Sequence, residues 1–403
     1  MPIRAALARL RAGAPAVPVA GRVRVENGAF SLADASAETP VAPVPGVAHG
    51  DIVAGILAPG GKLAGVVVLA RSRGPAADQD RDLGRRLGTL ADRAEIVAGI
   101  RALLRERGFL EVETPARVVC PGMEPHLVPF PAGHGRWLIT SPELHLKRLL
   151  AAGAERVFEL ARVFRDDERG PAHTTEFTML EWYRAHEGLD AIAADVAALL
   201  PCCALAAGRD PARVEGCDLS AAPERLTVRE AFQRHLGLDL ARHRGRDELA
   251  RAAVARGISV DAGDSWDDIF FRLFLQDVEP RLGRGRVTIL SEYPATQAAL
   301  ARVRADAEWP VALRFEVYAA GVELANAFDE LTDPDEQRRR HLADQELRRR
   351  SGLAVPELDE AFLAALEWGH PPAAGIALGV DRLVALVLGL PGARDAVAFP
   401  GEV

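Results

Sequence analysis

The chain has 403 residues, of which 49% are hydrophobic, and a formal net charge of −8. This length and composition allow a sizeable buried core and indicate two or three domains. The acidic balance argues against non-specific binding to nucleic acid, although a local basic patch could exist, and it suits cationic substrates or basic partner surfaces. Four cysteines without C-x-x-C spacing indicate reduced thiols in a cytoplasmic protein.

Residues 1–75 are predicted to form a small OB-like β-barrel preceded by a helix. The first thirteen residues contain three arginines and no uninterrupted apolar stretch, which favours an amphipathic helix over a secretory signal. Short β segments then alternate with turn signals such as Glu-Asn-Gly at 26–28. Phe30 is the only aromatic residue before Phe109. A role of the barrel in packing or dimerisation is therefore favoured over binding of single-stranded nucleic acid.

A linker over residues 76–90 is predicted to lead into a catalytic domain over residues 91–403. The linker is polar, charged and punctuated by glycines. Within the catalytic domain, residues 185–285 read as a mostly helical insertion. The apolar runs at 196–208 and 375–390 are too short or carry charges, so no transmembrane helix is predicted.

The densest set of chemical groups lies in residues 164–184. With the preceding residues from 156, this stretch is predicted to form two strands joined by a polar loop. Arg165 follows the first strand and can bind a phosphate through two hydrogen bonds, while Phe177 in the second strand can stack on a purine. Alternation along the second strand places Glu181 and Tyr183 on one face. This layout is that of a nucleotide-binding hairpin, although a single arginine or phenylalanine is more often plain surface or core.

Three other places in the sequence carry charged groups that could bind a ligand or a metal ion. At 141–143, Ser-Pro-Glu stands where a strand runs into a helix, and the serine and proline suit a helix start. Glu316, Glu323 and Glu330 are spaced seven apart, so they either face solvent or coordinate a hard metal ion and a cationic substrate. Arg382 lies at an otherwise apolar strand-to-helix junction, where a nucleotide phosphate would neutralise it.

The order of these pieces is that of motifs 1, 2 and 3 of class II aminoacyl-tRNA synthetases. Four segments resemble the elongation factor P lysine ligases, paralogues of lysyl-tRNA synthetase that aminoacylate a protein: TSPELHLKRLL, EFTMLEWYR, RFEVYAAGVELANAFDELTD and GIALGVDRLVALVLG. The resemblance covers residues 92–399. It implies an α+β fold in which helices flank an antiparallel sheet, and a cytoplasmic homodimer. It also implies that ATP and Mg²⁺ are used to activate lysine or (R)-β-lysine for transfer to elongation factor P, with tRNA disfavoured as the acceptor.

The resemblance also implies roles for individual residues. Arg165 is expected to bind the α-phosphate of ATP and Arg382 the γ-phosphate, which makes them the expected catalytic residues. Glu316 and Glu323 are expected to hold Mg²⁺. The remaining contacts expected with ATP are Asp167, which would meet the adenine amine, His173, Thr174, Phe177, Glu323, Leu324 and Gly379. The contacts expected with the amino acid are Ser141, Glu143, Glu181, Tyr183, Asn326, Glu330 and Ala377.

The chain departs from the family pattern, and three functions stay open. Arg-Asp-Asp at 165–167 stands where Arg-Asn-Glu is usual, and Thr-Thr at 174–175 stands where Asn-Pro is usual. Ala377 replaces a glycine typical of lysyl-tRNA synthetases and is expected to change which lysine isomer fits. The elongation factor P ligase is favoured. The alternatives are a divergent lysyl-tRNA synthetase whose barrel reads the anticodon, and a catalytically silent paralogue.

Overall fold

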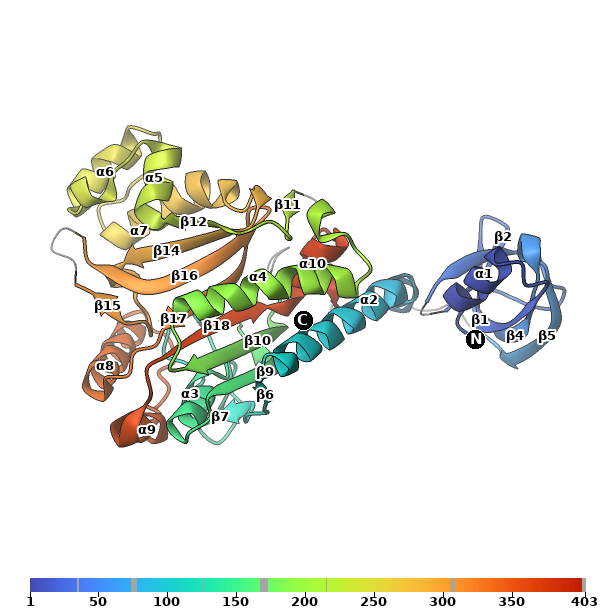
Figure 1. The fold of residues 1–403 in the computed structure, drawn as a ribbon, viewed down its shortest axis with the longest axis horizontal. Helices are drawn as coiled ribbons and strands as arrows, with labels where there is room; N and C mark the ends of the chain where they lie inside the picture. The colour runs from blue at the N-terminus through green and yellow to red at the C-terminus, as the bar shows by residue number, and fades with distance from the viewer. Residues whose placement is uncertain are drawn as a thin grey trace. The chain divides into compact units, whose positions relative to one another are not determined.

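The structure is a computed structural model (Figure 1) that describes residues 1–403 except 35, 74–77, 126, 167–172, 215, 306–308 and 401–403. For residues 78–85 it describes the backbone alone. The chain forms two compact units. The first comprises Met1–Glu95 with the C-terminal segment from Asp395, and the second comprises Ile96–Arg394. All the predicted site residues therefore belong to the second unit.

The first unit is an open antiparallel sheet packed against one helix. It contains α1 (Ile3–Arg11), β1 (Val17–Glu26), β2 (Ala29–Ala33), β3 (Glu38–Val41), β4 (Ile52–Leu57) and β5 (Leu63–Ala70). The strand order is β3-β2-β1-β4-β5. Alternate apolar residues of β1, such as Val17 and Val19, are buried together with Ile3 of α1. Period-two alternation thus gives this sheet one apolar face, which the helix covers.

The predicted OB-like barrel is not confirmed, because this sheet does not close. In the part of the chain that the structure describes, β3 and β5 stand at opposite ends of the strand order and do not pair. β3 has only four residues. Just beyond it, the backbone N–H of Ala42 donates to the carbonyl of Gly61, in the turn before β5, at 3.0 Å. The turn before β5 thus meets the residue just beyond β3, while no ladder of hydrogen bonds joins β3 to β5 among the described residues.

One long helix, α2 (Asp78–Glu106), occupies most of the predicted linker. Its apolar residues Ile96, Ile100 and Leu104 are buried. Gly108 follows the helix with a φ of 81°, a conformation that glycine adopts without strain and that suits a helix end. The domain limits predicted from the sequence, at residues 75 and 90, remain a prediction.

The second unit is built on a nine-stranded sheet, with strand order β12-β14-β16-β17-β18-β10-β9-β6 and β15 paired to β16. Its strands are β6 (Leu110–Glu111), β9 (Arg156–Phe164), β10 (Glu176–Ala185), β12 (Glu224–Thr227), β14 (Thr288–Pro294), β15 (Val303–Arg304), β16 (Val311–Ala319), β17 (Val322–Asp329) and β18 (Ala373–Gly379). The pairs β12–β14 and β6–β9 are parallel, and the central pairs are antiparallel. The predicted α+β fold with an antiparallel sheet is confirmed.

The register of the central strands brings distant sequence segments into one row. Glu181 of β10 lies opposite Ala377 of β18, which lies opposite Asn326 of β17. Asn326 in turn lies opposite Glu316 of β16. Because opposite residues in neighbouring strands point to the same face, these four predicted site residues share one face of the sheet.

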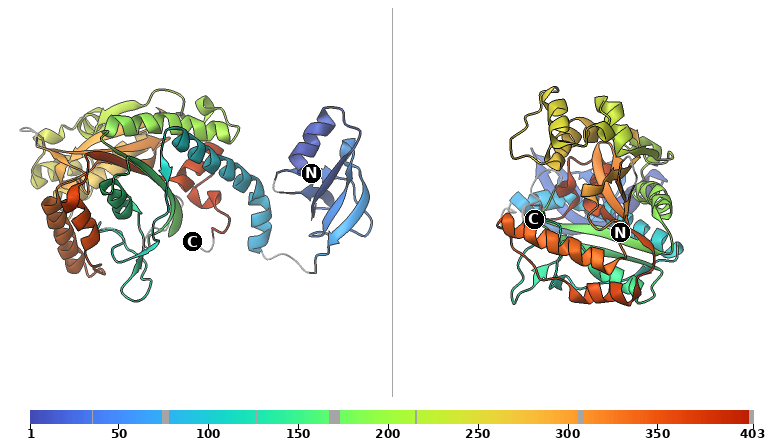
Figure 2. Two further views of the ribbon diagram at one scale, coloured as in Figure 1. Left: turned by 60° about the horizontal axis from the view of Figure 1, so that its bottom comes forward. Right: turned by 90° about the vertical axis from the view of Figure 1, so that its left-hand side faces the viewer.

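Helices cover both faces of the sheet (Figure 2). On one face lies α4 (Leu189–Ala206), whose Asp195 accepts hydrogen bonds from Trp182 Nε1 at 3.2 Å and Arg184 Nε at 2.6 Å. On the other face lies α3 (Glu143–Ala151), which packs against Tyr183 of β10. The alternation of β10 therefore directs Tyr183 and its face-mate Glu181 away from α4 and toward α3.

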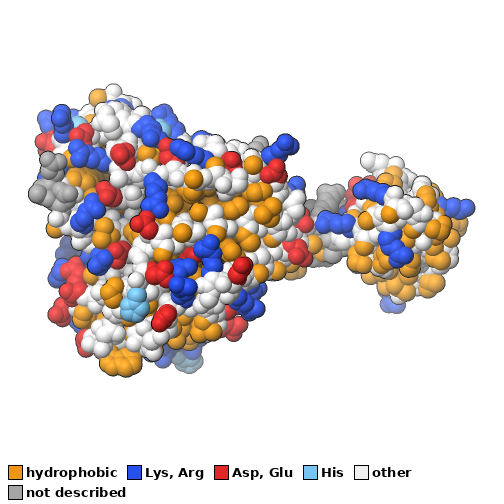
Figure 3. Space-filling view, in the orientation of Figure 1, with side chains coloured by type: hydrophobic (Ala, Val, Ile, Leu, Met, Phe, Trp, Pro, Cys, Tyr) orange, Lys and Arg blue, Asp and Glu red, His pale blue; other side chains and the backbone are white. Residues whose placement is uncertain are grey.

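The helix α4 is mostly apolar on both sides, apart from the exposed Asp190 and the buried Asp195. Among the described helices it is the one whose length and hydropathy would allow it to cross a membrane. Its inner side, however, packs on β17 and β18 as a core helix does. Its outer side exposes Ala194, Ala197 and Leu205, and Figure 3 shows apolar side chains gathered over this helix.

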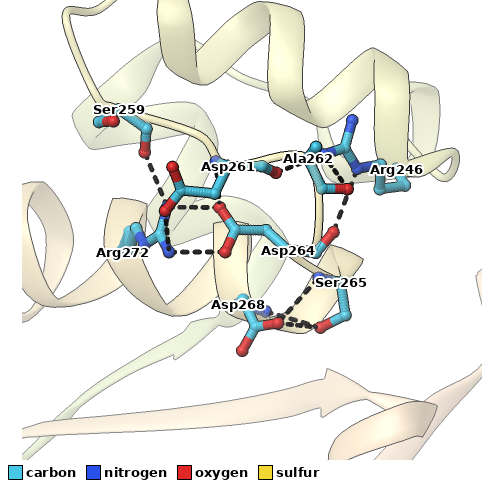
Figure 4. Close-up of polar contacts among 8 residues, drawn as sticks. All are labelled: Arg246, Ser259, Asp261, Ala262, Asp264, Ser265, Asp268 and Arg272. Carbon is cyan, nitrogen blue, oxygen red and sulfur yellow. Dashed lines mark hydrogen bonds and ion pairs between the residues drawn. The ribbon is translucent and has the colours of Figure 1, made fainter.

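Beyond α4, residues 226–282 are mostly helical, and their apolar side chains share one core with Leu290 of β14 and Tyr318 of β16. Figure 4 shows how Arg246 and Arg272 hold a loop of this segment: Arg272 pairs with Asp264 at 2.5 and 2.7 Å, and Arg246 donates to the Asp261 carbonyl at 2.7 Å. These contacts explain the fold of the loop. The helices and strands not yet placed are α5 (Val228–Leu236), α6 (Arg246–Val254), α7 (Trp266–Leu273), α8 (Pro334–Arg350), α9 (Glu360–Gly369), α10 (Val380–Leu388), β7 (Arg117–Val118), β8 (Trp137–Leu138), β11 (Cys217–Asp218) and β13 (Gly285–Arg286).

Candidate active site

A cavity of 340 Å³ contains most of the predicted site residues. Tyr183, Glu316 and Glu330 lie outside its lining, and Asp167 falls outside the described residues. The predicted residues that line it are Ser141, Glu143, Arg165, His173, Thr174, Phe177, Glu181, Glu323, Leu324, Asn326, Ala377, Gly379 and Arg382.

The acidic part of the cavity is built around Glu181. Its carboxylate accepts hydrogen bonds from Ser141 Oγ at 2.5 Å and from Tyr183 Oη at 3.0 Å. Ser141 Oγ also accepts the backbone N–H of Glu143 at 3.0 Å, at the start of α3. Burial, together with the nearby Glu143 carboxylate, raises the pKa of Glu181 from 4.5 to about 8. A cation bound in the cavity would stabilise the ionised form of this group.

A buried lysine that the sequence analysis did not single out links two of the predicted residues. Lys147 Nζ lies 2.6 Å from Glu143 Oε1 and 2.6 Å from Glu330 Oε2, and the lysine side chain is fully buried. Burial opposes its charged form, but the two carboxylates outweigh burial and raise the pKa of Lys147 above its ordinary value. Glu330 is thus paired inside the protein. The four-residue spacing of Glu143 and Lys147 on one helix was the available sequence signal.

We expect Lys147→Met to destabilise the protein by about 3–5 kcal/mol, because it leaves two buried carboxylates without their cation. Urea unfolding followed by circular dichroism measures this change. Lys62→Met is the control, since Lys62 is exposed and its replacement is expected to stay within about 0.5 kcal/mol. Equal stabilities of the two variants would contradict a stabilising role for the Lys147 pair.

The cavity also contains two guanidinium groups. The Arg165 Cζ atom lies 5.2 Å from the centroid of the Phe177 ring, and its Nη2 donates to the Thr140 carbonyl at 3.5 Å. Arg382, in the first turn of α10, donates from Nη1 to the Glu323 carbonyl at 3.1 Å and lies 3.6 Å from Glu323 Oε2. One space therefore holds both cationic groups and buried carboxylates, which suits a ligand that has phosphates at one end and ammonium groups at the other.

The two predicted metal ligands have different surroundings. Glu316 accepts hydrogen bonds from Tyr293 at 2.5 Å and from Tyr318 and Arg314. Glu323 faces the cavity, where burial and the Glu316 charge raise its pKa to about 7. The described residues contain no group of three or more His, Cys, Asp or Glu side chains suited to a metal ion. The carboxylate oxygens of Glu316 and Glu323, and the repulsion between their charges, suit a hard divalent cation. Binding of Mg²⁺ by these two residues therefore remains a proposal.

Two further residues of the site were missed. Asp381 accepts the backbone N–H of Thr178 at 3.0 Å and so joins α10 to β10. Gly375 lies opposite Tyr183, and a Cβ atom there would come within 2.2 Å of Tyr183 Cε1 and 2.6 Å of Glu330 Oε1. A glycine inside a strand often marks a place where a ligand or another part of the protein comes close to the backbone. The position of Gly375 within a strand was therefore the sequence feature that could have pointed to it.

Comparison with known proteins identifies the family. Residues 85–403 match the family described as tRNA synthetases class II (D, K and N). The elongation factor P (R)-β-lysine ligase of Yersinia enterocolitica is 40% identical over 324 residues, which cover 78% of this chain and 95% of that protein. The ligase of the same name from Salmonella paratyphi B is 41% identical over 321 residues, which cover 77% and 94%. The chain belongs to this ligase family of class II synthetases.

The resemblance inferred from the four sequence segments is thus confirmed. In this class II ligase, TSPE supplies Ser141 and Glu143 to the cavity, and the hairpin supplies Arg165, Phe177 and Glu181. The match to the family begins at residue 85, after the strands of the N-terminal sheet. The N-terminal sheet therefore lies outside the part of the chain that matches the family.

Proposed function

We propose that the chain is an ATP-dependent ligase that activates lysine or (R)-β-lysine as an aminoacyl adenylate and transfers it to a lysine side chain of elongation factor P. The observation that carries this proposal is the cavity that brings Arg165 and Arg382 together with Glu143 and Glu181. Guanidinium groups suit the phosphates of ATP, and buried carboxylates suit a cationic amino acid. The names of the Yersinia and Salmonella relatives support elongation factor P as the acceptor.

In the first step, an oxygen of the amino acid carboxylate attacks the α-phosphorus of ATP. The new O–P bond forms while the bond to the β-phosphate breaks, and pyrophosphate leaves with the electron pair. Arg165 stabilises the charge that develops on the α-phosphoryl oxygens, and Arg382 binds the terminal phosphate. Mg²⁺, when bound, neutralises phosphate charge, and Glu323 with Glu316 would hold it.

In the second step, the neutral amine of the acceptor lysine attacks the acyl carbon of the adenylate. A C–N bond forms, the bond from the acyl carbon to the phosphate oxygen breaks, and AMP leaves. The amine proton passes to solvent. The products are an amide on elongation factor P and AMP, so the reaction is balanced without any oxidant or reductant.

Two alternatives are less well supported. A lysyl-tRNA synthetase would need a surface on which anticodon bases stack, and Phe30, the one aromatic residue of the first unit's strands, is packed against that unit's core. A catalytically silent paralogue that only binds a partner would not need the phosphate-binding groups, yet Arg165 and Arg382 both line the cavity.

We further propose that the open sheet of the first unit serves in packing or dimerisation, and that the ligase is a cytoplasmic homodimer. The exposed side of α4, with Ala194, Ala197 and Leu205, offers apolar surface that a second copy would bury. The molar mass measured by light scattering, as the protein elutes from a size-exclusion column, tests the dimer. A single monomeric species at micromolar concentration would refute it.

One assay separates the three functions. The pure protein is incubated with ATP and labelled lysine or (R)-β-lysine, and then with either elongation factor P or total tRNA. The proposal predicts AMP formation and label on elongation factor P. Label on tRNA alone would establish the synthetase, and the absence of an adenylate with either amino acid would leave the silent paralogue.

Amino acid binding is expected to strengthen as pH rises toward 8. Below its pKa of about 8, Glu181 holds a proton that it must release to pair with an ammonium group. Affinity should therefore rise about tenfold per pH unit between pH 6 and 8 and then level off. Calorimetry in two buffers of different ionisation enthalpy counts the released protons. Glu181→Gln should abolish the pH dependence, and binding without proton release at pH 7 would contradict the prediction.

The raised pKa of Glu181 also makes the folding stability of the ligand-free protein depend on pH, but stability falls as pH rises, whereas amino acid affinity increases. Because the folded-state pKa of Glu181 lies above the ordinary value of 4.5, the folded state binds this proton more tightly than the unfolded chain does. The resulting stabilisation is fully present below the unfolded-state pKa and is lost as pH rises through about 8.

A further inference from the structure

Glu124 is a cavity residue to which the mechanism above gives no role. It lies in the segment that follows β7, within a stretch whose backbone is held by the buried Arg348. Arg348 Nη1 donates to the carbonyl of Glu124 at 2.7 Å and to that of Leu127 at 2.9 Å. The backbone that carries Glu124 is therefore fixed against α8.

One oxygen of the Glu124 carboxylate has no hydrogen-bond donor among the described residues. Its Oε2 atom is buried and has no hydrogen-bond partner among the residues that the structure describes. A Cβ atom at Gly122 would come within 2.6 Å of this oxygen, and Gly122 has a φ of 143° that favours glycine. The glycine thus makes room for a carboxylate oxygen that no hydrogen-bond donor in the described part of the protein satisfies. Such a group is costly unless a donor or cation binds to it.

The neighbours of Glu124 indicate which cation this is. Glu124 lines the same cavity as Glu143, the first carboxylate of α3, and Arg165, the arginine assigned to the α-phosphate, and the charges of both act on it. Glu143 already shares one oxygen with Lys147. Glu181 is occupied by Ser141 and Tyr183. A carboxylate can accept about four hydrogen bonds, so Glu143 and Glu181 can still accept from a ligand, and the buried Oε2 of Glu124 adds an acceptor that no described residue satisfies.

We propose that Glu124 binds the substrate ammonium group nearest to the reacting carboxylate, together with Glu143, and so helps to select amino acids that carry two amines. This inference rests on the proposed function. The cavity then offers one acidic position to each amine: Glu124 and Glu143 to the near one, and Glu181 to the far one. A monoamine such as 6-aminohexanoate, which lacks the near amine, gains nothing from Glu124.

The test compares Glu124→Gln with the wild-type chain in ATP–pyrophosphate exchange. For whichever of lysine or (R)-β-lysine the wild type activates, KM should rise tenfold or more in Glu124→Gln, whereas KM for ATP should stay within twofold. The inhibition constant of 6-aminohexanoate should change less than threefold. Glu357→Gln is the matched control, because Glu357 is exposed and lies outside the cavity.

The outcomes are distinguishable. Equal weakening of the diamino acid and of 6-aminohexanoate would overturn the proposal and assign Glu124 a structural role. Unchanged KM for the diamino acid would place the near amine elsewhere and would overturn it too, while leaving the ligase function intact. If the wild type activates neither amino acid, the proposed function fails and the inference falls with it. Thermal unfolding of each variant shows whether it is folded.

Discussion

Arg165→Ala is expected to lower ATP–pyrophosphate exchange at saturating amino acid by a factor of about 10² to 10³. The guanidinium group is the charge partner proposed for the α-phosphoryl oxygens, where negative charge develops in the transition state. It is also positioned in advance, since it lies over the Phe177 ring and bonds to the Thr140 carbonyl. The variant therefore loses a preorganised donor that water replaces poorly. Single-turnover measurement of adenylate formation by quenched flow checks the prediction.

Arg162→Ala is the matched control for this variant. Arg162 lies in β9, three residues before Arg165, which follows that strand; the Arg162 side chain is about half exposed and pairs with Glu176. Exchange by Arg162→Ala should stay near the wild-type rate. Arg165→Lys should be intermediate, because an ammonium group keeps the charge but not the two-pronged geometry. Near-normal exchange by Arg165→Ala would refute the assignment of the hairpin.

Gly375→Ala is expected to reduce both stability and amino acid binding. The added methyl group would meet Tyr183 at 2.2 and 2.3 Å and the Glu330 carboxylate at 2.6 Å, so at least one of them has to move. Overpacking of this kind costs about 1–3 kcal/mol of folding stability. Displacing Tyr183 also removes one hydrogen bond from Glu181. We expect KM for the amino acid to rise about tenfold or more, with a smaller change in KM for ATP.

Gly188→Ala is the control for the glycine effect. Gly188 precedes α4 with a φ of −106°, and an added Cβ would meet no atom within 4 Å among the described residues. Its exchange kinetics should match the wild type. Thermal unfolding with and without lysine would show whether the Gly375 variant is folded but binds poorly. Normal KM values in a folded Gly375→Ala protein would mean that Tyr183 does not shape the substrate site.

Several features of the site could be predicted from local sequence because they depend on local geometry. The alternation in residues 176–184 places Glu181 and Tyr183 on one face of a strand, and their hydrogen bond of 3.0 Å agrees with this. Ser-Pro-Glu at 141–143 marks the start of a helix, and the serine hydroxyl does accept the Glu143 N–H. Strand spacing and turn signals, in contrast, did not reveal whether the N-terminal sheet closes, because closure depends on the pairing of strands far apart in the chain.

The sequence by itself determined most of the groups that line the site, through the hairpin, the helix start and, of the evenly spaced glutamates, Glu323. Only the tertiary structure decided what each glutamate can do. Glu316 is occupied by tyrosine and arginine side chains, Glu323 faces the cavity beside Arg382, and Glu330 is paired with Lys147. The reason is physical: a carboxylate's charge state and partners depend on burial and on donors from other segments, which strand register and helix packing bring together.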